Sequence, residues 1–263
     1  MDTNPLPFTV DFQARLAVRL GGAAPIGAAG ALAMAPFNFV LIFFISFSCL
    51  YGLLAQANSK WQAFLTGWLF AFGYHIAGLY WIANALLVDG NPYSWAWPLA
   101  AIGLPAVLAI YFGLATLLIW RLVDLKSISG FFAFTLVLFA AEYLRGHLFT
   151  GFPWNLPGYG WGGVWPIVQT VDVIGIYGLT LLTILWCSLP GFLMLGNASR
   201  IAKSVIGTIT ILVFCASWSY GIYKLNQPSK HAGDTNSVNF VLIQPNIAQH
   251  NKWRGDKLRE NFR

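Results

Sequence analysis

Apolar stretches long enough to cross a lipid bilayer recur along most of this sequence. A membrane-spanning helix needs about 20 mostly apolar residues, and about seven stretches reach that length. We therefore predict an all-α polytopic membrane bundle with about seven transmembrane helices. The predicted spans cover residues 18–36, 38–56, 63–83, 96–119, 129–149, 171–195 and 204–222.

Composition supports lipid as the main solvent. Hydrophobic residues make up 57% of the chain and charged residues 9%, with a mean hydropathy of +0.64. A soluble domain carries about 25% charged residues. The net charge of +6 does not indicate nucleic-acid binding, because no basic patch with interleaved aromatic residues is present. Basic residues in a membrane protein typically mark cytoplasmic loops.

The first apolar stretch has two interpretations. Arg15 and Arg19 precede an Ala/Gly-rich run, and the small residues over 31–35 resemble a signal-peptidase site. A retained span is favoured, because the run is long and leads through residues 36–38 directly into the next apolar stretch.

Lysine and arginine positions predict the orientation. With the N-terminus in the cytoplasm, the opposite short loops contain only Arg145, and an odd number of spans places the chain after about residue 223 outside the cytoplasm. In a bacterium this predicts a multi-pass protein of the cytoplasmic (inner) membrane with a periplasmic or outer tail. The basic residues then on the cytoplasmic side are Arg15, Arg19, Lys60, Arg121, Lys126, Arg200 and Lys203.

The C-terminal tail has the composition of a linker followed by the start of a soluble domain. Residues 1–223 form the predicted transmembrane domain, and the polar residues 224–236 read as a linker. An apolar run over 237–243 predicts a buried strand, and 251–263 predicts a helix. A strand followed by a helix opens an α/β domain, but forty residues cannot complete one. We therefore expect 237–263 to be the incomplete start of such a domain.

Ionisable residues in a predicted span are candidates for function. Glu142 and Arg145 are three positions apart and share a helix face. One interpretation is a structural ion pair that neutralises both charges. The other is an exposed Arg145 that binds a lipid phosphate, because guanidinium geometry matches phosphate. The nearby His147 reads as a residue of the helix end rather than a catalyst.

The segment from Thr150 to Pro166 is rich in glycine, proline and aromatic residues. Glycine and proline oppose a continuous helix, and aromatic residues favour the headgroup level. Non-helical backbone at that depth requires protein or water around it. We predict an interfacial or re-entrant loop on the outer side.

Other candidate chemistry is sparse. Cys49, Cys187 and Cys215 all lie in apolar runs without disulfide or metal-ligand spacing, so we predict packing roles. No phosphate loop, metal motif, nucleophile elbow or convincing pair of catalytic carboxylates is present. Isolated polar residues near span ends are His75, Asn84 and Asp172.

Two motifs carry a resemblance to a known family. Glu142-x-x-Arg-Gly followed by Thr150-Gly-Phe-Pro-Trp154 resembles the E-x-L-R-G and TGFPW stretch of apolipoprotein N-acyltransferases. The later run from Val241 to Trp253 is similar to the opening of that family's nitrilase-like domain, including its Q-x-x-I and K-W pattern. The resemblance covers essentially the whole chain and identifies the α/β start as nitrilase-like.

The resemblance implies a reaction and its partners. These enzymes transfer an acyl chain from a phospholipid donor to the α-amino group of an apolipoprotein's S-diacylglyceryl cysteine, within the lipid bilayer. A cysteine forms a thioester, a glutamate acts as base and a lysine stabilises the oxyanion, with no metal or organic cofactor. These three residues belong to a later part of the family's sequence, so no catalytic residue is assigned here and the chain alone is expected to be inactive.

We predict substrate binding by Glu142, Arg145, Trp154 and Trp253, and the resemblance assigns a role only to Trp253, near the acyl-chain entrance. An alternative from another class is a non-catalytic membrane remnant that binds lipid or a partner protein. A small transporter is disfavoured, because transporters usually show repeat symmetry and broken midplane helices.

Overall fold

The computed structural model describes residues 21–88 and 90–227, together with a few positions between 241 and 259. Regular structure in this described part is helical throughout. An apolar helix over Gly21–Ala33 ends in the 3₁₀ turn η1 (Ala31–Ala33). The elements that follow are α2 (Leu41–Ala55), α3 (Lys60–Leu79), η2 (Tyr80–Leu87), η3 (Ser94–Ala96), α4 (Trp97–Leu122), α5 (Ile128–His147), η4 (Pro157–Trp161), α6 (Trp165–Val168), α7 (Val171–Leu195) and α8 (Arg200–Leu225).

The prediction of a bundle of long, apolar helices is confirmed. Five described helical segments are long and apolar enough to cross a bilayer, and they match the third to seventh predicted spans. The first two predicted spans correspond to the shorter apolar helices Gly21–Ala33 and Leu41–Ala55. The count of seven spans therefore stays a prediction, as do the strand over 237–243 and the helix over 251–263, which fall largely outside the described residues.

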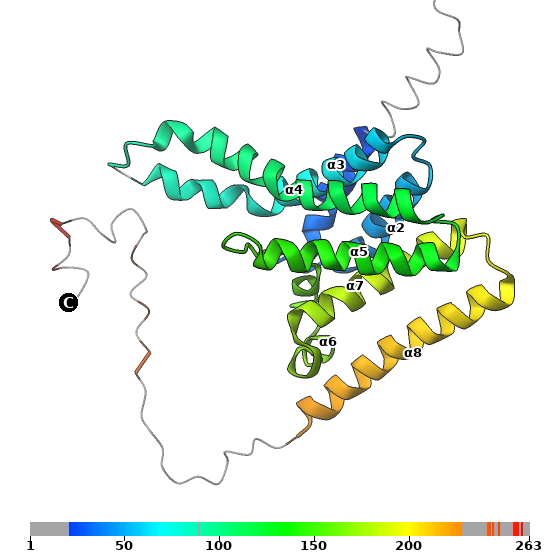
Figure 1. The fold of residues 1–263 in the computed structure, drawn as a ribbon. Coiled ribbons are helices and arrows are strands. Elements are labelled where there is room, and N and C mark those ends of the chain that lie inside the picture. Colours follow the sequence, from blue (N-terminus) through cyan, green and yellow to red (C-terminus); the bar gives the residue numbers. More distant parts are fainter. Residues whose placement is uncertain are drawn as a thin grey trace, which may run out of the picture.

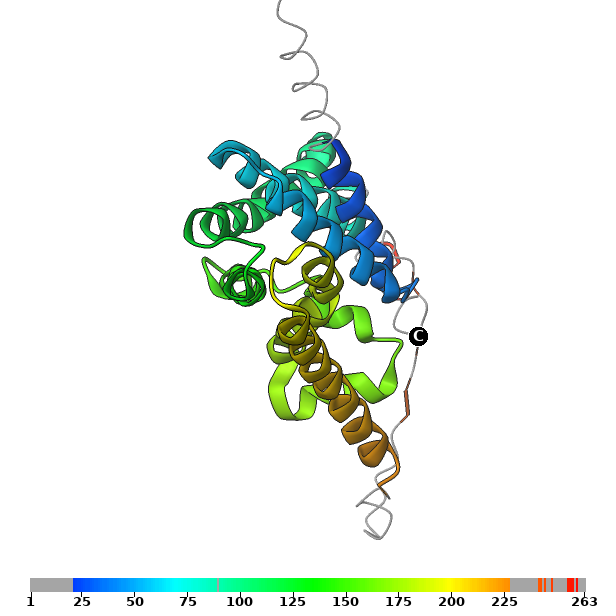
Figure 2. The same cartoon turned by 90° about the vertical axis from the view of Figure 1, so that its right-hand side faces the viewer.

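The helices differ in how closely they join the bundle. α3 and α4 pack along each other, and Figure 1 shows their outer ends, continued by η2 and η3, extending away from the other helices. α2 packs on α7, and α5 packs on both α4 and α7. The long helix α8 contacts mainly α6 and α7, and Figure 2 shows it along one side of the bundle. Much of its surface is therefore left to lipid.

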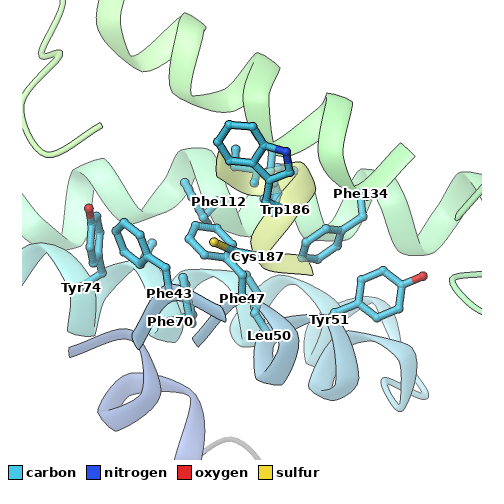
Figure 3. Packing of buried hydrophobic residues seen from close by; sticks show 14 of the residues in the cluster. Phe43, Phe47, Leu50, Tyr51, Phe70, Tyr74, Phe112, Phe134, Trp186 and Cys187 are labelled. Atoms are coloured by element: carbon cyan, nitrogen blue, oxygen red, sulfur yellow. The ribbon is translucent and has the colours of Figure 1, made fainter. Parts of the chain in front are cut away.

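Aromatic side chains fill the centre of the bundle, as Figure 3 shows. Phe70 of α3 lies between Phe47 of α2, with ring centroids 5.8 Å apart, and Phe112 of α4, at 6.2 Å. Tyr51 of α2 meets Phe134 of α5 edge to face at 4.9 Å. Because lipid tails are as apolar as these side chains, close packing rather than water exclusion holds such helices together.

Glycines set the closest backbone contacts. Gly73 of α3 lies against the backbone of Ala24, and Gly27 lies against the backbone of Phe70. A Cβ atom on Gly73 would come 1.9 Å from the Ala24 carbonyl oxygen, and one on Gly27 would come 1.8 Å from that of Phe70. Small residues allow this approach in membrane bundles. The first apolar helix is thus packed closely on α3, and the retained-helix interpretation stays a prediction.

Three helices begin at serine caps. Ser59 precedes α3, Ser127 precedes α5 and Ser199 precedes α8, and each hydroxyl accepts a hydrogen bond from a backbone N–H three residues later. A serine in this position satisfies one of the unpaired N–H groups of the first turn. All three helix starts lie on the side that the charge pattern predicts to be cytoplasmic, next to Lys60, Lys126 and Arg200.

Candidate functional site

Glu142 and Arg145 meet in the interior of the bundle, on one face of α5. Both are buried, with exposed fractions of 0% and 1%. Arg145 donates to Glu142 Oε2 through Nε, at 3.2 Å, and through a terminal nitrogen. The ion pair, one of the two interpretations of their spacing, is therefore present. Each charge depends on the other, because an unpaired charge in an apolar interior is costly.

The remaining donors of Arg145 bind the loop that follows α5. Its other terminal nitrogen donates to the carbonyl oxygens of Phe152, at 2.5 Å, and Trp154, at 3.0 Å. The Phe152 N–H donates back to the Arg145 carbonyl at 2.9 Å. A guanidinium has five N–H donors in a fixed plane, and here two of them join α5 to the backbone of the loop. We call residues 148–156 with these contacts the clamped loop.

Backbone conformation lets the clamped loop fold back on α5. Phe149, Gly151 and Asn155 have φ values of 59°, 72° and 55°, in the left-handed region. Glycine adopts this region without strain and asparagine tolerates it, whereas a bulky residue such as Phe149 does so at a cost. The predicted departure from a continuous helix over 150–166 is confirmed, with the turn η4 inside it.

The geometry corrects one expectation about Arg145. An exposed guanidinium free to bind a lipid phosphate was one of the two interpretations, but the side chain is fully buried and its donors meet Glu142 and two loop carbonyls. Arg145 therefore holds the loop in place from the interior of the bundle. The loop exposes Phe149, at 97%, and Trp154, which is 50% exposed and lies 5.3 Å from the ring of Trp81.

A second tether joins α3 to the clamped loop. The Tyr74 hydroxyl donates to the Asn155 carbonyl at 2.9 Å, although the residues are 81 positions apart. Beside it, His75 is completely buried, and neither ring nitrogen has a hydrogen-bond partner within the described residues. Glu142 Oε1 and Asn155 Nδ2 are likewise unpaired there. Buried polar groups are normally paired, so this concentration of unpaired atoms distinguishes the region from the apolar core.

Two cavities border the clamped loop. One, of about 570 Å³, lies between α4 and residues 148–152 and is apolar apart from Arg145 and Thr150. The other, of about 620 Å³, is lined by residues after η1, by the junction of α3 with η2, and by Pro153, Trp154, Asn155 and Tyr159. Both volumes lie in the range of small-molecule sites. The Arg145 contacts thus shape the walls of both.

The other predicted residues have varied surroundings. His147 ends α5 as expected, its ring stacked 4.1 Å from that of Tyr143. Asn84 accepts from the Trp97 indole at 3.1 Å, and Asp172 is not isolated, because it pairs with Lys224 and accepts from Tyr220. Trp253 lies outside the described residues.

All three cysteines lie in apolar helices. Cys187 is buried, whereas Cys49 is half-buried and Cys215 is exposed, so the predicted packing role is wrong for Cys215. In the described part of the chain, no group of three His, Cys, Asp or Glu side chains is placed to hold a metal ion.

Sequence reasoning missed Tyr74, Trp81 and Asn155 as parts of this site. Tyr74 and Trp81 belong to an apolar stretch in which they read as ordinary span and belt residues. Asn155 directly follows the TGFPW motif. Its position after the motif was the one available signal, and the partner on α3 could not be inferred without the helix packing.

Comparison with known proteins decides the family. A family profile described as the apolipoprotein N-acyltransferase N-terminal domain matches residues 26–189, which include α2 to α5 and the clamped loop. The chain belongs to the apolipoprotein N-acyltransferase family. It is 38% identical over 237 residues to an apolipoprotein N-acyltransferase of Allorhizobium ampelinum, which covers 85% of this chain and 42% of that protein.

Other relatives agree. The chain is 38% identical over 236 residues to the apolipoprotein N-acyltransferase of Rhizobium rhizogenes, covering 86% of this chain and 43% of the relative. It is 35% identical over 245 residues to that of Brucella melitensis, covering 90% and 45%. The chain thus spans less than half the length of these curated relatives. Family membership confirms the resemblance drawn from the two motifs.

Proposed function

We propose that this chain forms the membrane-embedded, lipid-binding part of an apolipoprotein N-acyltransferase. The donor is a phospholipid, and the acceptor is the α-amino group of a lipoprotein's S-diacylglyceryl cysteine. The observation that carries the proposal is the buried Glu142–Arg145 pair, which holds the TGFPW loop within a chain 38% identical to named apolipoprotein N-acyltransferases. A buried ion pair is costly to maintain, so its use to fix one interfacial loop indicates that the loop's shape matters.

In this proposal the site residues have different roles. Trp154 contacts lipid at the headgroup level, where indole rings are favoured. Arg145 and Glu142 act through the loop, as positioning residues, rather than by touching the phosphate. Trp253 contacts the acyl chain near its entrance, as the family resemblance implies.

We assign the chemistry itself to the family's nitrilase-like domain rather than to the membrane-embedded part described here. In the family reaction a cysteine thiolate attacks the ester carbonyl of the phospholipid, and the lysophospholipid leaves with a proton. The lipoprotein amine then attacks the thioester and releases the thiol. Such a nucleophile needs a base and an oxyanion stabiliser beside it. Cys49, Cys187 and Cys215 lie within apolar helices of the membrane-embedded part, and we do not assign them this role.

We also propose the cytoplasmic (inner) membrane as the location, with the tail after α8 on the outer side. The support is the basic residues next to the starts of α3, α5 and α8. A phosphatase that requires export, fused after Ser229, should be active. An inactive phosphatase, with an active cytoplasmic reporter at the same junction, would overturn this orientation.

The test of the proposed function uses the purified 263-residue chain in detergent. With labelled phospholipid, we expect non-covalent lipid retention and no hydroxylamine-sensitive acyl adduct, because no cysteine of the membrane-embedded part is assigned as the nucleophile. Absence of lipid retention would argue against the lipid-binding role. An adduct that disappears when Cys49, Cys187 or Cys215 is replaced by serine would show that this chain carries out chemistry itself.

A further inference from the structure

The aromatic cavity beside the clamped loop has the features of a built binding site. Three segments that are distant in sequence form its wall, and Phe37, Trp81, Trp154 and Tyr159 are each at least 44% exposed around it. The Trp81 indole N–H is already used, donating to the Gly78 carbonyl at 3.0 Å. Phe37 and Trp81 therefore offer a ligand apolar surface.

One buried polar group in the wall lacks a partner. Asn155 Nδ2 has no hydrogen-bond acceptor within the described residues and lies against Gly78, which also lines the cavity. The Asn155 backbone is fixed by Tyr74, and the preceding carbonyl by Arg145. The terminal torsion of the side chain is soft. Turning the amide presents its NH₂ group to the cavity at little cost.

The charge of the wall restricts the ligand. No Lys, Arg, Asp or Glu is among the described residues that line this cavity. A phosphate group would lack a counter-charge here. A neutral hydrogen-bond acceptor attached to an apolar body matches one amide donor surrounded by aromatic rings. At the membrane interface, the ester carbonyl of a glycerophospholipid, with the acyl chain that follows it, has this combination.

We propose that this cavity binds the ester region of a glycerophospholipid, with Asn155 donating to an ester carbonyl and Trp81 and Trp154 contacting the adjoining chain. The inference rests on the lipid-binding role proposed above and specifies which part of the lipid is recognised. It assigns to Asn155 a ligand contact, and to Tyr74 and Arg145 the task of holding Asn155 and Trp154 in place.

The test compares an ester lipid with its ether analogue. The purified chain, freed of lipid in detergent, is titrated with diacyl phosphatidylcholine and with dialkyl-ether phosphatidylcholine, which keeps the headgroup and chains but lacks both carbonyls. One hydrogen bond contributes about 0.5–1.5 kcal/mol, so we expect the ester lipid to bind about two- to tenfold more tightly. Native mass spectrometry measures both affinities.

Variants at Asn155 identify the donor. Asn155→Asp removes the NH₂ group at a position where the left-handed backbone suits both residues, and Asn155→Gly removes the side chain without changing the net charge. Both should abolish the preference for the ester lipid. The matched control is Asn38→Asp, because Asn38 also has a φ of 55° and is exposed, but does not line the cavity. It should keep the preference.

The outcomes separate this inference from the broader proposal. Equal affinity of the wild-type chain for ester and ether lipids would overturn the ester assignment and leave lipid binding intact. An ester preference that survives in folded Asn155→Gly would overturn the role of Asn155. Failure of the wild-type chain to bind either lipid would overturn the lipid-binding function as well.

Discussion

Replacing Arg145 by alanine should lower the free energy of unfolding by about 3–5 kcal/mol, because it leaves a buried carboxylate without its partner. The side chains of Glu142 and Arg145 are both 0% exposed, so water cannot substitute for the lost contacts. The same change removes two hydrogen bonds to the clamped loop. Thermal unfolding of the purified chain in detergent measures the stability loss, and protease cleavage near Trp154 reports loop release.

Two further variants separate charge from loop anchoring. Glu142→Leu combined with Arg145→Met removes both charges and should recover much of the stability, since an apolar pair of similar volume often replaces a buried ion pair. It should leave the loop cleavable, because the donors to Phe152 and Trp154 are gone. Arg121→Ala, at an exposed position near the end of α4, is the control and should change little. Normal stability of Arg145→Ala would contradict the buried-pair account.

Adding one methyl group at Gly73 should also be severely destabilising. A Cβ atom there would lie 1.9 Å from the Ala24 carbonyl oxygen, so the first apolar helix would have to move away from α3. Overpacking costs about 1–3 kcal/mol or more even where side chains can adjust, and here the obstacle is backbone. The yield of monodisperse protein and the unfolding temperature measure the effect of Gly73→Ala.

Gly103→Ala is the matched control, because Gly103 also lies within a long helix but has no neighbouring atom within 4 Å of the place that the added methyl carbon would occupy. Alanine favours a helix over glycine by about 1 kcal/mol, so this change should be neutral or stabilising. The two substitutions are thus expected to have opposite signs. A Gly73→Ala protein as stable as Gly103→Ala would mean that the first helix does not pack tightly on α3.

The helices were predicted well wherever the length of an apolar stretch is enough to define the span. Residues 171–195 were predicted as one span and form α7. Within α7, Gly175 has a φ of 66° and interrupts the helical geometry, and the length of the apolar stretch does not indicate this interruption. The pairing of Glu142 with Arg145 was predictable because both lie on one helix turn. The burial of Arg145 was not predictable, because its other partners are backbone carbonyls of a loop. The course of that loop depends on Gly151 and Asn155.

Long-range tethers were beyond sequence reasoning for a related reason. The Tyr74–Asn155 hydrogen bond joins α3 to the loop after α5, and nothing in a single sequence indicates which helices are neighbours. The three cysteines read alike in sequence, each within an apolar run, yet Cys187 faces the core and Cys215 faces outward. Which outcome occurs depends on the rotation of each helix about its own axis. The sequence of a helix that is apolar on all faces does not indicate this rotation.

The most direct test of the account joins this chain to the remainder of a relative. Residues 1–236 replace the corresponding region of the Brucella melitensis apolipoprotein N-acyltransferase, to which this chain is 35% identical over 245 residues. The chimera is expressed in a strain depleted of its own enzyme, and mass spectrometry of a lipoprotein's N-terminal peptide measures acylation. We predict N-acylated peptide with the wild-type chimera and a loss of about tenfold or more with Arg145→Ala, because misplaced binding groups reduce rates strongly. A chimera that is inserted and as stable as the parent enzyme, yet leaves the lipoprotein amine free, would contradict the account.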